Sequence, residues 1–217
     1  YVVPQDIYES RNLEVYQYAK VDIDFRRTRP LVNQATLALR WHTGIAIPYG
    51  DNKTLPYEKY FFAGGSNSIR GWRPRRLGPG SYSNIDESGS ISYQQEQQGE
   101  ILFEASLELR QNLFGFVDWA FFIDAGNIWM IERDNSRPGA NFEIDRFYKE
   151  IAIASGLGLR LDFSFLIIRF DAGAKIYDPA RNIGQRFILS EDFNKAPFND
   201  TNRTEPIILN IGIGYPF

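Results

Sequence analysis

The residues with the greatest potential for specific chemistry lie in one glycine- and arginine-rich segment, Phe61–Gly80, which reads FFAGGSNSIRGWRPRRLGPG. Arginine is always charged, and its planar guanidinium binds carboxylates or phosphates through paired hydrogen bonds. Arg70 therefore has two open roles: a buried ion pair with acidic side chains elsewhere, or part of an exposed patch for phosphate groups. The other members of such a patch would be Arg73, Arg75 and Arg76. Gly64, Gly65 and Gly71 would permit the positive φ values and close approaches that a tightly tucked loop needs.

The rest of the chain lacks the residue patterns expected of a catalytic site, a metal site or a nucleic-acid-binding surface. There is no cysteine and only one histidine, His42, so thiolate and histidine-rich zinc sites are excluded. The nucleophile elbow G-x-S-x-G and the phosphate-binding glycine motifs are both missing. The chain has 24 Lys and Arg against 27 Asp and Glu, a net charge of −3, which does not provide the basic surface that nucleic acids require. We expect no catalysed reaction, no metal, no cofactor and no nucleic-acid partner.

The elements that must position these residues are β-strands, because apolar and polar residues alternate with a period of two. At the C-terminal end, the odd positions of Ile207–Phe217 are large and apolar while most even positions are small or polar. This pattern predicts that the odd residues face lipid. Seven such runs are recognisable, near residues 21–25, 35–41, 101–109, 117–123, 151–159, 168–176 and 207–217.

The connections between the predicted strands alternate strictly between short and long. Short turns are expected near residues 28–30, 112–115 and 163–165, and long polar connections near 48–99, 132–149 and 178–205. An up-and-down antiparallel sheet whose two ends meet different surroundings has this asymmetry, as outer-membrane barrels do with their tight periplasmic turns and long extracellular loops. The segment rich in glycine and arginine then lies in the first long extracellular loop, at about 48–99.

A secreted β-sandwich is the alternative, since its strands also have one apolar and one polar face. Several runs here continue for about ten residues or more, which is typical of tilted membrane strands and long for a sandwich. No charge-free stretch is long enough for a membrane-spanning helix, because the longest is Pro206–Phe217. The prediction is an all-β transmembrane barrel. Seven strands are too few to close a bacterial barrel, so residues 1–217 are expected to be the C-terminal part of a larger one.

The motif Gly64-Gly65 followed by Ile69-Arg70-Gly71-Trp72 resembles the BamA/TamA family of outer-membrane assembly barrels, also called bacterial surface antigens. In that family an aromatic-Ala-Gly-Gly-Ser segment precedes Val-Arg-Gly-aromatic in the sixth extracellular loop, and Ile69 replaces the commoner valine. Further likeness lies in ASLELRQN, FFIDAGNIW and the final aromatic residue, Phe217. The resemblance implies an antiparallel barrel of 16 strands in which five strands follow this loop, as predicted here.

The resemblance also implies roles for individual residues. The family's loop arginine folds back into the barrel lumen and pairs with acidic residues on the next two strands, which correspond to Glu108 and Asp124; either acid alternatively only lines a wet pore. Gly212 matches the position at which the family's last strand kinks, although it alternatively only relieves crowding in the lumen. Phe217 matches the family's C-terminal assembly signal, or is simply an aromatic residue at the membrane interface.

The function implied by the resemblance is insertion or assembly of β-barrel proteins in the bacterial outer membrane, where this chain would be an integral protein. Its partners would be client outer-membrane proteins, the lipid bilayer, lipopolysaccharide, and accessory periplasmic or lipoprotein subunits. Two alternatives remain open. The barrel is either a relative of two-partner-secretion transporters that carries a protein across the membrane, or an anchor for an upstream enzyme domain.

Overall fold

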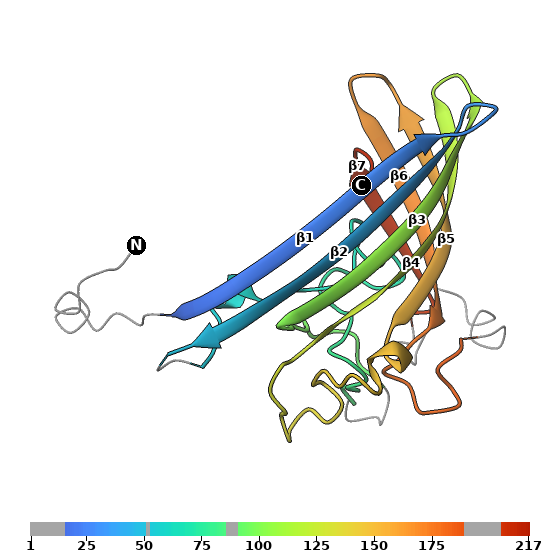
Figure 1. The fold of residues 1–217 in the computed structure, drawn as a ribbon. Coiled ribbons are helices and arrows are strands. Elements are labelled where there is room, and N and C mark those ends of the chain that lie inside the picture. The colour runs from blue at the N-terminus through green and yellow to red at the C-terminus, as the bar shows by residue number, and fades with distance from the viewer. Residues whose placement is uncertain (1–15, 51–52, 86–90, 189–204) are drawn as a thin grey trace, which may run out of the picture.

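The computed structural model describes residues 16–50, 53–85, 91–188 and 205–217. Within them, seven antiparallel strands form one curved sheet in the order β1-β2-β3-β4-β5-β6-β7, which confirms the predicted fold (Figure 1). The strands are β1 Gln17–Pro30, β2 Ala35–Tyr49, β3 Ile101–Phe114, β4 Val117–Trp129, β5 Ala152–Asp162, β6 Ile167–Tyr177 and β7 Ile207–Ile213. Two single-turn 3₁₀ helices, η1 Tyr57–Lys59 and η2 Phe147–Lys149, lie in the connections.

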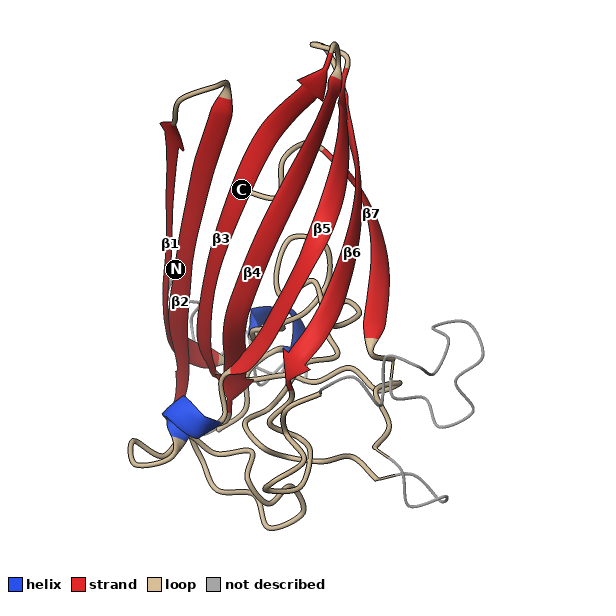
Figure 2. Cartoon of the chain, turned by 90° about the vertical axis from the view of Figure 1, so that its right-hand side faces the viewer, coloured by secondary structure: helices blue, strands red, loops and turns tan. Residues whose placement is uncertain are grey.

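The connections separate by length, with the short turns at one end of the sheet and the long loops at the other (Figure 2). The first short turn lies at residues 31–34, not at 28–30 as predicted. Pro30 remains in β1 as its last residue, opposite Thr36 of β2. The chain reverses instead at Asn33 and Gln34, whose φ angles are 57° and 59°.

The two faces of the sheet are inverted relative to a water-soluble protein. Outward residues are apolar and well exposed, for example Trp41 at 47%, Leu157 at 61% and Ile211 at 72%. The inward face instead carries charged side chains that are almost fully buried, such as Glu108 and Arg160. Apolar-out, polar-in strands need an apolar solvent around them, and a sandwich would bury the apolar face between two sheets.

A small apolar core lies on the inward side, where the long loops meet the sheet. Here Leu102 of β3 and Ile128 of β4 pack with Ile69 and Trp72 of the first long loop. Leu102 broke the alternation in the sequence, and its position explains why: the inward face is apolar where the loop covers it. No helix among the described residues has the length and apolarity to cross a membrane.

The last strand is shorter than predicted. β7 ends at Ile213, and Gly214 follows with φ of 76°, so the alternation does not continue to Phe217. The residues after β7 contact Arg110 on the inward face of β3: its guanidinium lies 4.1 Å from the ring centre of Tyr215, and its Nη2 donates to the carbonyl oxygen of Phe217 at 3.1 Å. The lipid-facing prediction is thus wrong for Tyr215 and Phe217, because a glycine-supported turn redirects the chain.

Candidate functional site: the arginine lock

The site is built around Arg70 in the long loop between β2 and β3, residues 50–100. This loop enters the concave side of the sheet, and Arg70 itself is completely buried. Its backbone N–H and its Nε both donate to Asp124 Oδ2, at 3.0 and 2.8 Å, and Nη2 donates to Asp124 Oδ1 at 2.9 Å. Nη1 donates to Glu108 Oε2, and the guanidinium lies 3.4 Å from the ring centre of Phe122. We call this arrangement the arginine lock.

The structure therefore brings Arg70, Glu108 and Asp124 together on the inward face. Asp124 holds the guanidinium through two parallel hydrogen bonds, which fixes its orientation as well as its charge. A buried charge without a partner would cost several kcal/mol, so the loop, once inside, depends on these carboxylates. An exposed anion patch that includes Arg70 is ruled out by its burial, whereas Arg73 is exposed and pairs with Glu205 at 2.7 Å.

The lock is part of a larger charged network whose other members the sequence did not single out. Glu108 also accepts a hydrogen bond from Arg110 at 2.7 Å and lies 3.2 Å from Arg160. Asp171 pairs with Arg160 at 2.5 Å and with Arg169 at 3.4 Å. All of these side chains belong to the polar, inward set of the strand alternation. The alternation predicts the side of the sheet on which each of them lies, but it contains no information about which of them meet across the lumen.

Five strands hold the tip of the loop, mostly through its backbone. Arg169 Nη1 of β6 donates to Ser66 O at 2.8 Å, and Arg40 Nη1 of β2 donates to Asn67 O at 2.7 Å. Ser68 donates to Glu104 of β3. Asn210 Nδ2 of β7 donates to the carbonyl oxygen of Arg70 at 3.0 Å, while β4 supplies Asp124. Because donors and acceptors come from β2, β3, β4, β6 and β7, the tip cannot move without breaking contacts on several strands.

The glycines of the motif act in two ways. Gly64 and Gly65 have φ angles of 102° and 99°, which L side chains rarely adopt. They start a tight turn that the hydrogen bond from Gly65 N to Trp72 O closes at 2.8 Å. Gly71 lies so close to Ala154 of β5 that a Cβ at position 71 would collide with it. The remaining motif residues, Ile69 and Trp72, are buried in the apolar core described above.

Gly212 of β7 lies directly opposite Arg169 in the β6–β7 ladder. A Cβ at position 212 would collide with the guanidinium of Arg169. Gly212 thus leaves room in the lumen for that side chain, while the turn after the strand occurs at Gly214. Roles for Gly212 in a seam and for Phe217 as an assembly signal stay predictions.

The arrangement holds the long loop in place on the inward face of the sheet. The buried carboxylates of the lock are each engaged by arginine. Among the described residues, no group of three or more His, Asp or Glu side chains gathers to hold a metal ion.

Comparison with known proteins identifies the family. A model of the Omp85 superfamily domain matches residues 13–193. The outer membrane protein assembly factor BamA of Neisseria meningitidis serogroup B is 32% identical over 126 residues, which are 55% of this chain and 15% of that protein. The chain thus spans a small part of the length of this relative.

A solved structure shows the same fold. BamA from Haemophilus ducreyi, in a form lacking POTRA domains 1–3, matches with a TM-score of 0.56 and 21% identity, over 80% of this chain and 34% of that one. CdiB from Acinetobacter baumannii matches with a TM-score of 0.49 and 16% identity, over 92% and 27%. The chain belongs to the Omp85 superfamily and is a segment of an integral β-barrel of the bacterial outer membrane.

Proposed function

We propose that the protein containing this chain inserts and folds β-barrel proteins in the bacterial outer membrane. The observation that carries the proposal is the arginine lock, which fixes a motif loop across the inward face of the sheet. The sequence similarity to a protein named as an outer membrane protein assembly factor supports it. Client barrel proteins, lipid and accessory subunits are the partners that this proposal requires, and it requires no catalysed reaction.

The physical basis of insertion would be an exposed strand edge. β7 is the shortest strand and lies at the edge of the described sheet, with β6 as its only partner there. An unpaired backbone N–H or C=O in hydrocarbon costs several kcal/mol, so an open edge in the membrane is a template for a further strand. An unfolded client would satisfy these groups by adding its own strand to β7.

An insertion assay tests the proposal. The full protein is reconstituted in liposomes, an unfolded outer-membrane barrel protein is added, and the folded client is measured by its resistance to protease and by its heat-dependent gel mobility. We expect folding to be faster than in empty liposomes, and slower again with Arg70→Ala. Arg73→Ala is the matched control, because this side chain is exposed and lies outside the lock.

The same assay separates insertion from secretion. Insertion leaves the client embedded in the bilayer, whereas a translocator would deliver it, soluble and protease-protected, to the opposite side. A rate equal to that of empty liposomes, or a soluble client in the liposome interior, would overturn the proposed function.

A further inference from the structure

The motif loop, which is the connection between β2 and β3 that carries residues 64–72, lies along the inward face of strand β6. The four buried residues of β6 are Arg169, Asp171, Gly173 and Lys175, and each approaches the loop. Arg169 donates to the carbonyl oxygen of Ser66 at 2.8 Å, and Asp171 lies 3.9 Å from the Arg70 guanidinium. Gly173 faces the backbone of Arg70 and Gly71. Lys175 Nζ lies 5.4 Å from the centre of the Trp72 ring. The loop therefore lies lengthwise on β6, the strand that pairs with β7.

Gly173 sets how closely the loop approaches. A Cβ at this position would collide with the carbonyl group of Arg70 and would stand 3.0 Å from Gly71 N. The absence of a side chain at 173 thus lets two backbones meet directly. Ile208 of β7 is the partner of Gly173 in the ladder, and Asn210 bonds Arg70 O from the same strand. The tip of the loop consequently rests on both β6 and β7.

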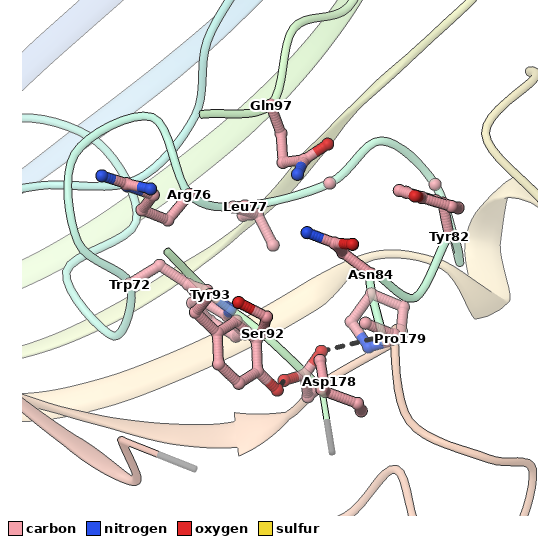
Figure 3. Close-up of a pocket in the computed structure, with 14 residues that line it drawn as sticks. Trp72, Arg76, Leu77, Tyr82, Asn84, Ser92, Tyr93, Gln97, Asp178 and Pro179 are labelled. Carbon is pink, nitrogen blue, oxygen red and sulfur yellow. Dashed lines mark hydrogen bonds between the residues drawn. The ribbon is translucent and has the colours of Figure 1, made fainter. Parts of the chain in front are cut away.

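Lys175 forms a second cluster at the far end of this contact. Its ammonium lies 3.5 Å from the ring centre of Tyr93, which belongs to the returning part of the same loop. The Tyr93 hydroxyl donates to Asp178 just beyond β6, as Figure 3 shows. Asp178 also accepts from Ala180 N at 3.0 Å, which fixes the carboxylate. Lys175, Tyr93 and Asp178 are all buried, so a desolvated cation faces the ring and a buried hydroxyl has its acceptor.

We propose that Lys175, Tyr93 and Asp178 form a second anchor for the motif loop, independent of the arginine lock, and that this anchor presses the loop onto Gly173 and so braces β7. Arg70 fixes the tip of the loop to β3 and β4. The second anchor fixes the segments before and after residues 86–90, through Tyr93 and Trp72, to β6. These are positioning residues, because they act on β7 through the loop.

The consequence is a coupling between the loop and the strand edge. Loosening the second anchor should free the loop from β6, remove the contact from Asn210 to Arg70 O, and let β7 open more often. The prediction for the exchange of backbone amides does not depend on the proposed function. Only the expectation that the same variants also change client insertion depends on the proposed function.

Hydrogen exchange of the full protein in liposomes tests the proposal. Lys175→Met removes the charge and keeps an unbranched stem, and Tyr93→Leu removes the ring. We expect the amides of residues 70–72 and of β7 to exchange about tenfold faster in each, as the loss of one desolvated cation–π contact would give. Tyr93→Phe keeps the ring for Lys175 and should stay much closer to the unmodified protein than Tyr93→Leu.

The controls separate a local anchor from general stability. Ala174→Val, at the outward neighbour of both Gly173 and Lys175, should leave exchange in the loop unchanged. The double variant Lys175→Met with Tyr93→Leu should accelerate exchange by less than the product of the two single effects, because the Lys175–Tyr93 contact is lost in both. Unchanged exchange in the loop and β7, additive effects, or equal acceleration in the β1–β2 hairpin would each overturn the second anchor. If the exchange results are as expected but the unmodified protein does not insert a client, the second anchor stands and only the proposed function is contradicted.

Discussion

Replacing Arg70 by alanine should have a consequence that differs sharply between its two carboxylate partners. Among the described residues, the hydrogen bonds to the Asp124 carboxylate all come from residue 70: two from the guanidinium and one from the backbone N–H. Glu108 keeps Arg110 at 2.7 Å and Arg160 at 3.2 Å when Arg70 is removed. Arg70→Ala therefore leaves Asp124 as a buried carboxylate with one hydrogen bond, while Glu108 remains paired.

The magnitudes follow from that difference. Breaking a buried pair by removing one partner costs about 3–5 kcal/mol, much of it from the charge left behind. In double-mutant cycles we expect a coupling energy of about 2–3 kcal/mol between Arg70 and Asp124, and below about 1 kcal/mol between Arg70 and Glu108. Arg70→Ala with Asp124→Ala should then cost about 2–3 kcal/mol less than the sum of the two single variants.

Urea titration of the protein in lipid bilayers gives these free energies, and cleavage of the long loop by an added protease reports its release. Arg73→Ala is the matched control, since this exposed arginine pairs only with Glu205 among the described contacts. Equal coupling to both acids, or no coupling to Asp124, would refute the pairing that we derive from the geometry.

Three further changes have expected outcomes. Arg70→Lys keeps the charge but loses the forked contact, so protease cleavage of the loop should fall between the unmodified protein and Arg70→Ala; cleavage as fast as in Arg70→Ala would mean that charge contributes nothing. Ile211→Arg places a charge on the lipid-facing side of β7 and should lower the free energy of unfolding by about 2–4 kcal/mol in a bilayer folding titration. Asn210→Ala removes only the hydrogen bond to the loop and should cost about 1 kcal/mol, so similar costs for the two variants would contradict the assignment of faces. Deletion of Phe217 should lower the yield of protein assembled in the outer membrane more than the urea midpoint of the folded barrel, and a normal yield would remove its role as an assembly signal.

The sequence was sufficient for the strands and for the centre of the lock. Alternation with a period of two depends only on neighbouring residues, so it located all seven strands, and Glu108 and Asp124 stand at polar positions of two of them. Arg70 was paired with them through the family motif, since no local pattern shows that a loop residue enters the lumen. Gly214 and the pair Asn33–Gln34 were not recognised as turns, because the alternation and proline positions were given more weight than backbone geometry.

The residues that sequence reasoning missed act across the sheet. Asp171, Gly173 and Lys175 alternate with apolar residues in the sequence, but their roles depend on where loop residues more than 80 positions earlier in the chain come to lie. Tyr93 stood in a long polar segment without periodicity, and its contacts with Lys175, Asp178 and the apolar core join residues far apart in the chain. Contacts of this kind are set by the whole fold and leave no mark in local patterns.

Site-specific photo-crosslinking during insertion tests most directly whether client strands enter at β7. A photoreactive residue is placed at Leu209 of β7 and, as the matched outward position on a central strand, at Leu107 of β3; these side chains are 63% and 41% exposed. While an unfolded barrel client is being inserted, we expect adducts with the client from position 209 and few from position 107. Equal yields from the two positions, or no adduct from β7 while the client folds, would contradict insertion at this edge.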